Sequence, residues 1–581
     1  MTQERARKTQ AELRSQRWYG SNDMRGFAHR QRSQQMGLRR EEFMGRPVIG
    51  IINTWSDMSP CHSHLRDRAE AVKRGVWQAG GYPVELPALS VGEVMVKPTT
   101  MLYRNFLAME TEELLRSHPI DGAVLLGGCD KSTPGLLMGA ISMDLPAIFC
   151  PAGPMSNGQW RGTKTGAGTH TRKYWDELRA GTITPQDWVD LESRMTRSIG
   201  TCNTMGTAST MTSIVDVMGL TLPGASSIPA ADSGHVRMAS ACGVRICEMV
   251  WEDLRPSTIL SRETFLNGAV AYMAMGGSTN AAVHLIAMAR RAGVELTLDD
   301  LSEVAARIPV AANLFPSGEY LMEDFYFAGG ILALMRKFSR HLALDRPTVS
   351  GQTLGEAIAG AECWNDDVIR GETDPVVSLQ RGKTLQVLRG NLAPDGAVMK
   401  SSAADPKFLR HRGPAIVFDD PAEMNRVLDD PDLDITEDWV IVLRNAGPVG
   451  APGMPEWGNL PIPKKLLKQG VRDMVRICDG RMSGTHYGTC ILHVAPEAAV
   501  GGPLGLLRTG DMVSLDIAAG TLDMEVNEAE LERRRGESVP RKPLYGRSYA
   551  ALYQRHVSQA DKGCDFDFLE GSEKLPDPVI Y

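Results

Sequence analysis

The feature that most constrains the fold is a regular alternation of strand-like and helix-like segments between residues 47 and 150. Short runs of apolar and β-branched residues are separated by longer segments in which apolar residues recur with helical spacing. Two of these longer segments stop at typical helix ends, Gly80-Gly81 and Pro119. Such an order predicts a parallel sheet with helices on both faces. The predicted strands are 47–53, 82–89, 121–126 and 146–150, and the predicted helices are 64–79, 100–118 and 134–143.

The pattern changes in the last third of the chain. Helix-like segments separated by Gly- and Pro-rich loops continue beyond Ser198, and near 375–385 they give way to short strand-like runs. Turn residues separate these runs, which is typical of a β-barrel or a sandwich. We therefore predict an α/β domain over 1–380 and a β-rich domain over 381–581. The predicted strands of the second domain are 385–389, 415–418, 439–443, 474–478, 490–494 and 512–517.

Length and charge exclude several classes of protein. The 581 residues far exceed the roughly 250–300 at which a single hydrophobic core stops growing. Since 63 Lys and Arg stand against 70 Asp and Glu, for a net charge of -7, no basic excess points to nucleic acid or an anionic membrane as partner. No apolar run approaches the ~18 residues of a membrane span.

Cysteine usage indicates a reducing compartment. Ten cysteines are too few for a disulfide scaffold in a chain of this length, and no two form a C-x-x-C pair. The first forty residues are basic in the manner of a transit peptide, but Trp18-Tyr19-Gly20 within them is typical of folded protein. We predict a cytoplasmic protein with reduced thiols available as metal ligands.

Residues that carry chemistry follow the predicted strands at their carboxyl ends. The loop after the first strand holds Cys61, and the loop after the second holds Glu93. The third strand is followed at once by Cys129-Asp130-Lys131. Because ligands bind beyond the carboxyl ends of strands in parallel α/β sheets, we expect these thiols, carboxylates and the lysine to meet at one edge of the sheet.

A further cysteine, Cys202, stands where a helix rich in small residues begins. Backbone N–H groups at such a start favour a thiolate. From the residues alone, Cys61, Cys129 and Cys202 fit small buried side chains as well as metal ligands. Inert core thiols are instead predicted inside apolar runs, at Cys150, Cys247 and Cys490.

Two motifs that would indicate other enzymes are incomplete. In 129–132 the aspartate Asp130 stands where a phosphate-binding loop needs a glycine before its lysine. The segment 480–484 departs from the G-x-S-x-G of hydrolase nucleophiles. Neither nucleotide binding nor serine hydrolysis is therefore supported.

Six motifs follow one another along nearly the whole chain: NTWSDMSPC (53–61), GGCDKSTPG (127–135), GTCNTMGTAST (200–210), GGSTNA (276–281), GPVGAPGMPEWGN (447–459) and DGRMSGT (479–485). Together they resemble the dihydroxyacid/6-phosphogluconate dehydratase family, and most of all its sugar-acid dehydratases, which act on aldonates and pentonates. The opening LRSQRWYG at 13–20 shares the resemblance. It implies an N-terminal α/β domain, a C-terminal β-barrel, a 2Fe–2S cluster, a Mg²⁺ ion and a homodimer or homotetramer.

The resemblance also implies roles for single residues. From the residues alone, Lys131 fits a solvent-facing or Asp130-paired lysine, Glu456 a solvated acid and Ser483 a turn residue. Thr485, two residues after Ser483, is a candidate for orienting substrate, although such hydroxyls often bond only local backbone. The implied set is Cys61, Cys129 and Cys202 on the cluster, Glu93, Asp130, a carbamylated Lys131 and Glu456 on Mg²⁺, and Ser483 as catalytic base.

The implied reaction is loss of water from a 2,3-dihydroxy acid, which gives an enol and then a 2-keto acid. A cluster with three cysteine ligands leaves one iron without a fourth protein ligand, which suits Lewis-acid work at the C3 hydroxyl better than electron transfer. Mg²⁺ prefers oxygen ligands and suits the substrate carboxylate and C2 hydroxyl. A Ser483 alkoxide would take the C2 proton.

Three other functions stay open at this stage. A branched-chain dihydroxyacid dehydratase would need an apolar pocket, for which 94–96 is a candidate. A 6-phosphogluconate dehydratase would need a phosphate site, and a non-catalytic iron–sulfur protein would need neither Ser483 nor the Mg²⁺ set. His62 and the apolar Glu93 loop depart from the usual family pattern close to the expected substrate. The Thr-, Asn- and Ser-rich 200–210 loop favours polyhydroxylated acids.

Overall fold

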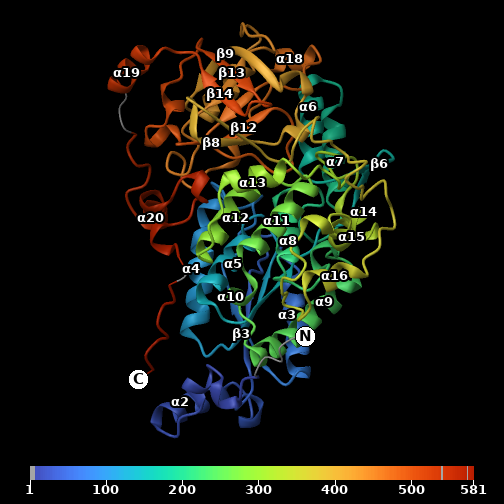
Figure 1. Cartoon of the computed structure of the whole chain (residues 1–581), viewed down its shortest axis with the longest axis vertical. Coiled ribbons are helices and arrows are strands. Elements are labelled where there is room, and N and C mark those ends of the chain that lie inside the picture. The colour runs from blue at the N-terminus through green and yellow to red at the C-terminus, as the bar shows by residue number, and fades with distance from the viewer. Residues whose placement is uncertain (1–6, 538–540, 572, 581) are drawn as a thin grey trace.

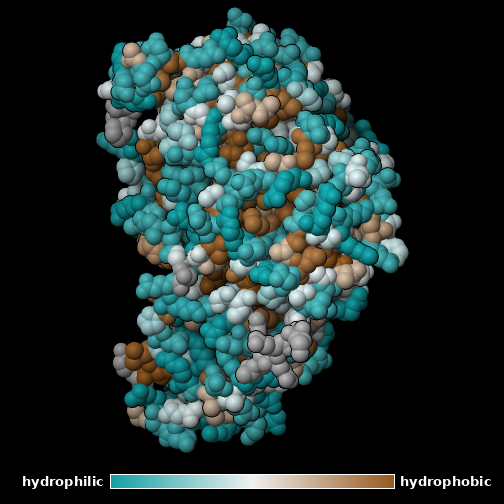
Figure 2. Space-filling view, in the orientation of Figure 1, coloured by the Kyte–Doolittle hydropathy of each residue, from teal (hydrophilic) through white to brown (hydrophobic). Residues whose placement is uncertain are grey.

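The computed structural model describes residues 7–537, 541–571 and 573–580. Figure 1 shows an α/β region, blue to yellow, joined to a β-rich region in orange and red. Helix α2 (Met24–Gln35) projects at the end of the molecule far from the β-rich region. Figure 2 shows a surface that is mostly hydrophilic with scattered apolar areas. Met24 and Phe27 of α2 are 83% and 61% exposed. Within the described residues, no helix combines the length and the apolar character that crossing a membrane requires.

The predicted parallel sheet is present, with strand order β2-β1-β3-β4. In its register, Ile51 of β1 lies opposite Glu85 of β2 and Val124 of β3. Strands β1, β3 and β4 are buried along their whole length, which is why their sequences are continuous apolar runs. The strands are β1 (Val48–Asn53), β2 (Tyr82–Pro87), β3 (Gly122–Gly127) and β4 (Ala147–Pro151), within about two residues of their predicted bounds.

The strand order places helices on both faces of the sheet, as predicted. The chain moves one way from β1 to β2 and the other way from β2 to β3 and β4. Right-handed crossovers then put α3 (Leu65–Gln78) on one face and α4 (Met101–Ser117) and α5 (Ser132–Met143) on the other. Helix α9 (Ser233–Glu252) packs beside α3, and α4 packs against α5. The loops after the neighbouring strands β1 and β3 therefore leave toward opposite faces and open a crevice at the carboxyl edge.

Further helices surround this sheet, and most of them share its hydrophobic core. Helices α6 (Thr169–Ala180) and α7 (Pro185–Met195) instead pack in a separate small cluster around Trp160. Helix α8 (Thr207–Val217) is buried along its whole length and begins with small and hydroxyl-bearing residues, which lets neighbouring chain approach closely. The other α-helices of this region are α1 (Gln16–Tyr19), α10 (Pro256–Ile259), α11 (Arg262–Ala274), α12 (Asn280–Arg291), α13 (Leu298–Ala305), α14 (Met322–Phe327), α15 (Gly330–Lys337) and α16 (Leu354–Ala359).

The β-rich region is a closed eight-stranded barrel with its own hydrophobic core, so of the two predicted forms the barrel is found rather than the sandwich. Around it the order is β10-β11-β12-β8-β7-β14-β13-β9. The strands are β7 (Gln386–Gly390), β8 (Ala393–Met399), β9 (Arg410–Phe418), β10 (Val440–Leu443), β11 (Arg476–Cys478), β12 (Cys490–Ala495), β13 (Met512–Asp516) and β14 (Thr521–Met524), with α17 (Pro421–Leu428), α18 (Lys464–Lys468), α19 (Glu528–Glu537) and α20 (Ser548–His556) outside them.

Two barrel strands were absent from the sequence prediction. Strand β8 contains Pro394-Asp395-Gly396, a typical turn sequence, and Gly396 lies where its pairing with β12 is irregular. Strand β14 is short and only alternately buried. Both are needed for closure, because β8 joins β12 to β7 and β14 joins β7 to β13.

The basic N-terminal stretch is folded onto the α/β region, as Trp18 and Tyr19 predicted. Both side chains are buried in the main core. The Ser15 backbone N–H donates to the buried carboxylate of Asp121, directly before β3, at 2.9 Å.

Candidate functional site

The carboxyl edge of the sheet brings the loops after β1 and β3 together. Cys61 follows β1, and Cys129 follows β3 after Gly128, where a Cβ would lie 2.6 Å from the Ala152 side chain. The imidazole of His62 accepts a hydrogen bond from the Cys129 backbone N–H at 3.2 Å and so ties the two loops together. Burial lowers the pKa of His62 to about 3, which keeps the ring neutral and able to accept. His62, a departure from the family pattern, is thus a support for the Cys129 loop.

Three cysteines form a group that we call the thiol group: Cys61, Cys129 and Cys202. The first two are buried and Cys202 is half-buried, in the loop before α8. The neighbouring Cys129 thiol, burial and the charge of Cys202 raise the pKa of Cys61 well above its ordinary value. Burial, followed by Asp130 and Cys129, raises the pKa of Cys202. The three thiols therefore influence one another, and the sheet geometry predicted this for Cys61 and Cys129.

The other cysteines that the sequence singled out lie in the core, as predicted. They are at most 1% exposed and sit within strands or helices: Cys150, Cys247 and Cys490.

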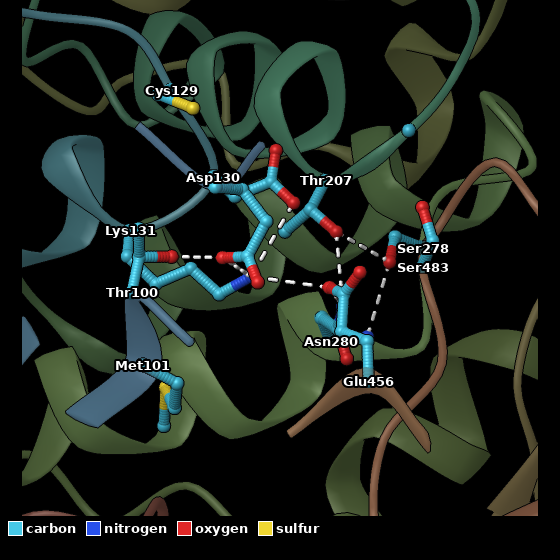
Figure 3. Close-up of polar contacts among 12 residues, drawn as sticks. Thr100, Met101, Cys129, Asp130, Lys131, Thr207, Ser278, Asn280, Glu456 and Ser483 are labelled. Carbon is cyan, nitrogen blue, oxygen red and sulfur yellow. Dashed lines mark hydrogen bonds and ion pairs between the residues drawn. The ribbon is translucent and has the colours of Figure 1, made fainter. Parts of the chain in front are cut away.

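Next to the thiol group lie three carboxylates that we call the acidic group: Glu93, Asp130 and Glu456. Their oxygen atoms lie within 4.8 Å of one another. The fully buried Lys131 ammonium lies among them, with Nζ 2.9 Å from Glu93, 3.2 Å from Glu456 and 3.4 Å from Asp130 (Figure 3). Lys131 therefore does not face solvent, and the Glu456 side chain, 15% exposed, is no solvated surface acid.

Opposed charges dominate the electrostatics of the acidic group. Burial favours the neutral form of Glu456, but Lys131, Arg481 and Arg172 outweigh it and lower the pKa to about 2. Burial raises the pKa of Asp130, and Glu456 and Glu93 add to that rise. Burial would lower the pKa of Lys131, but the three carboxylates raise it. A cation is thus held strongly at this point of the fold.

Two residues that sequence reasoning did not single out hold Glu456 in place. Arg481 is fully buried and donates to the Met454 carbonyl at 2.9 Å, to Glu456 at 3.2 Å and to the Thr99 hydroxyl at 3.1 Å. The Asn280 amide donates to the same Glu456 oxygen at 3.2 Å. Both lie inside motifs of the resemblance, 276–281 and 479–485, which was the available signal.

Ser483 and Thr485 lie in the turn after β11, facing α8. Their hydroxyls are 2.8 Å apart. Between them Gly484 packs so closely that a Cβ there would lie 2.4 Å from the Ser278 hydroxyl. Ser483 and Ser278 appear together with Glu456 in Figure 3. The Thr485 carbonyl, rather than its hydroxyl, bonds to the neighbouring Thr169 at 2.7 Å.

The apolar part of the Glu93 loop is exposed to solvent. Val94 and Met95 are 66% and 50% exposed. Glu93 itself accepts hydrogen bonds from the hydroxyls of Thr99 and Thr100, which hold the carboxylate toward Lys131. The loop therefore provides a carboxylate to the site without providing an apolar wall.

Comparisons with known proteins cover both regions. The N-terminal model of the dihydroxy-acid/6-phosphogluconate dehydratases matches residues 46–357, and the C-terminal model matches residues 367–564. A 6-deoxy-6-sulfo-D-gluconate dehydratase from Pseudomonas putida is 70% identical over 98% of each chain. An L-arabinonate dehydratase from Rhizobium leguminosarum bv. trifolii is 48% identical over 96% of each. A dihydroxy-acid dehydratase from Caldanaerobacter subterraneus is 38% identical, over 93% of this chain and 97% of the relative.

Proposed function

Because the chain belongs to the dihydroxy-acid/6-phosphogluconate dehydratase family, we propose that it removes water from a 2,3-dihydroxy sugar acid, an aldonate, to give a 2-keto-3-deoxy acid. The observation that carries the proposal is the thiol group beside the acidic group, with the Ser483 turn joined to Glu456 through Asn280, which donates to both Glu456 and the Met482 carbonyl. The sulfogluconate and L-arabinonate dehydratases are more similar to this chain than the dihydroxy-acid dehydratase is, and the first of them acts on a sulfonated gluconate.

The thiol group fits a 2Fe–2S cluster held by Cys61, Cys129 and Cys202. Soft thiolate ligands select iron–sulfur clusters, and three of them leave one iron without a protein ligand. Without metal, the raised pKa values of Cys61 and Cys202 keep these thiols protonated, and a bound metal removes such protons.

The acidic group fits Mg²⁺, which takes hard oxygen ligands. Glu93, Asp130 and Glu456 would hold it, and Lys131 would join them as a carbamate. An ammonium among three carboxylates balances their charge, so replacing it by an anionic carbamate requires another cation in the same place. When bound, the cluster and Mg²⁺ would supply Lewis-acid chemistry at the leaving hydroxyl and at the substrate's acid end.

Ser483 is proposed to take the proton from the C2 carbon. An ordinary serine hydroxyl is far too weakly acidic for this, so the site must favour its alkoxide. Thr485 can donate to Ser483 Oγ across their 2.8 Å separation, and the Arg481 and Lys131 charges lie in the same site. Thr485 thereby orients and stabilises the base.

Of the other functions, the branched-chain reaction is less supported, because the candidate apolar residues Val94 and Met95 are exposed. A non-catalytic iron–sulfur protein would have no use for the acidic group or for Ser483.

We also propose a cytoplasmic homodimer or homotetramer that acts on a small molecule, with neither nucleic acid nor membrane as partner. The division at residue 380 into two domains is part of the same proposal.

An assay of 2-keto acid release tests the function. The purified protein, loaded with iron, sulfide and Mg²⁺, is offered 6-deoxy-6-sulfogluconate, gluconate, arabinonate and 2,3-dihydroxyisovalerate. We expect the sugar acids to be dehydrated with the higher kcat/KM. Faster turnover of 2,3-dihydroxyisovalerate than of any sugar acid would overturn the substrate class, and no turnover of any acid would overturn the function.

A further inference from the structure

One arginine near the site, Arg172, has no side-chain partner among the described residues. Arg172, in α6, is half-buried, and its Nε is fully buried without a hydrogen bond. No ion pair or side-chain hydrogen bond joins its guanidinium to any residue that the structure describes. The buried Arg291 and Arg481, in contrast, each pair with a carboxylate. Because a buried N–H without an acceptor is costly, the half-buried Arg172 guanidinium is expected to meet an anion that the described residues do not supply.

Helix α6 is docked onto the turn that carries Ser483. The Thr169 hydroxyl donates to the Thr485 carbonyl at 2.7 Å, and a Cβ on Gly168 would lie 2.4 Å from the Thr485 hydroxyl. One turn later, the backbone N–H of Arg172 donates to the Gly168 carbonyl at 3.1 Å. Figure 1 shows α6 beside the barrel, next to α18. Arg172 thus belongs to the helix that closes over this turn.

The charge of Arg172 interacts with residues of both the acidic group and the thiol group. Burial lowers the pKa of Arg172, and the charges of Glu456 and Cys202 oppose that shift. Arg172 in turn helps to lower the pKa of Glu456. The guanidinium therefore lies within electrostatic reach of both the acidic group and the thiol group.

His486 presents a second donor without an acceptor. Its Nε2 lies 3.3 Å from Nη1 of Arg476, which can only donate, so the proton of the neutral ring is on Nδ1. That Nδ1 is buried and has no hydrogen-bond partner among the described residues. Burial and then Arg172 lower the pKa of His486 well below its ordinary value, so the ring is neutral and near Arg172.

We propose that Arg172 and His486 bind an anionic substituent at the far end of the sugar acid, and that they set a preference for terminally sulfonated aldonates. The inference rests on the proposed function, in which the acidic group takes the carboxylate end. A guanidinium and an Nδ1–H offer several donors to a group with several anionic oxygens. Of the terminal anions, we favour a sulfonate because the relative at 70% identity acts on a 6-sulfonated gluconate.

The test compares two substrates that differ at the far end. The metal-loaded protein and its Arg172→Gln variant are assayed with 6-deoxy-6-sulfogluconate and with gluconate. In the variant, we expect the ratio of kcat/KM for the sulfonated over the unsubstituted acid to fall about 10- to 100-fold, as for the loss of one hydrogen-bonded charge. In Arg172→Lys this ratio should fall less than in Arg172→Gln, because lysine keeps the positive charge.

Lys173→Gln is the matched control, because it removes a charge from the next, exposed residue of α6 and should leave the ratio unchanged. His486→Phe should lower the ratio less than Arg172→Gln does. If Arg172→Gln lowers kcat/KM equally for both acids, or lowers neither, the assignment is overturned. A preference for 6-phosphogluconate that Arg172→Gln removes would support the anion site and make its ligand a phosphate.

Measurements of substrate binding test the role of Arg172 independently of the proposed dehydration. If the wild-type protein dehydrates neither acid, the proposed function fails, and calorimetry with the same two acids then decides on Arg172. Tighter binding of the sulfonated acid by the wild type, lost in Arg172→Gln, supports the anion site. Equal binding of the two acids by the wild type overturns it.

Discussion

The sheet side and the barrel side of the site are built in different ways. On the sheet side, Cys61, Glu93 and Cys129 each follow a strand of one parallel sheet, so the strand order alone brings them to one edge. On the barrel side, Glu456 begins a short 3-10 helix after β10, and Ser483 lies in a turn after β11. They reach the same place only because the barrel docks on the α/β region. The sheet side is thus a local consequence of topology, and the barrel side is a consequence of assembly.

The largest expected effect falls on the sheet side. Replacing Cys61, Cys129 or Cys202 by Ser should abolish both the brown colour and the activity, because a hard oxygen replaces a soft ligand. The measurements are iron content, about two atoms per chain in the wild type, and keto-acid release. Cys150→Ser, in the core, is the control and should keep both. Full iron content in all three variants would contradict the assignment of the thiol group.

The next effect tests whether the barrel side supplies chemistry rather than metal binding. Ser483→Ala should retain iron and Mg²⁺ yet lose the ~10²–10⁴-fold that acid–base catalysis contributes. It should also stop exchange of the substrate's C2 hydrogen with solvent deuterium. If the variant keeps more than about a tenth of wild-type turnover, an effect under ~1.4 kcal/mol, Ser483 is a turn residue and another group is the base.

A smaller effect tests how the two sides are joined. Arg481→Lys keeps the charge but loses the fork that reaches Glu456, Met454 and Thr99 at once. The Mg²⁺ concentration needed for half-maximal activity should rise about 10- to 100-fold, as for other residues that orient metal ligands. Arg412→Lys, an exposed barrel arginine paired with Glu525, is the control. An unchanged Mg²⁺ dependence in Arg481→Lys would show that Glu456 needs no support from the barrel.

The smallest effect concerns the pH dependence of the barrel side. Burial and the charge of Asp479 raise the pKa of Glu497 to about 7, although the Gln559 amide and the Gly450 and Val449 N–H groups oppose the rise. The folded state therefore binds this proton more tightly than the unfolded state does. The resulting stability is complete below about pH 4.5 and is lost as the pH rises through about 7.

The Glu497 proton contributes on the order of 1–3 kcal/mol at most to the free energy of unfolding. The melting temperature of the metal-free protein should fall between pH 5 and pH 8, and Glu497→Gln should flatten that slope. If the melting temperature instead rises over this range in the wild type but not in Glu497→Gln, the raised pKa of Glu497 is contradicted. Glu437→Gln, at an exposed ion pair of the barrel region, should leave the slope unchanged.

Arg481 and Asn280 illustrate why part of the site could not be derived from residues alone. Each lies in a motif that the sequence made visible, but a motif does not say which atoms a side chain will reach. Arg481 bonds to Thr99 across 382 positions of the chain, and Asn280 bonds to Glu456 across 176. Arg172 is a stronger case, because no motif could show that its guanidinium is left unpaired by the residues that the structure describes.

The sequence by itself determined the parallel sheet and the meeting of the Cys61 and Cys129 loops at its carboxyl edge. Continuous apolar runs of strand length, helical spacing and glycine ends are local signals, and the rule for carboxyl ends turns them into a position for Cys61 and Cys129. Only the tertiary structure decided the closure of the barrel, since β8 and β14 carry turn-like or weakly patterned residues and are strands because neighbours pair with them. It also decided the charges of the acidic group and the isolation of Arg172. Burial and the separation between charges govern both, and they exist only once distant segments of the chain have packed together.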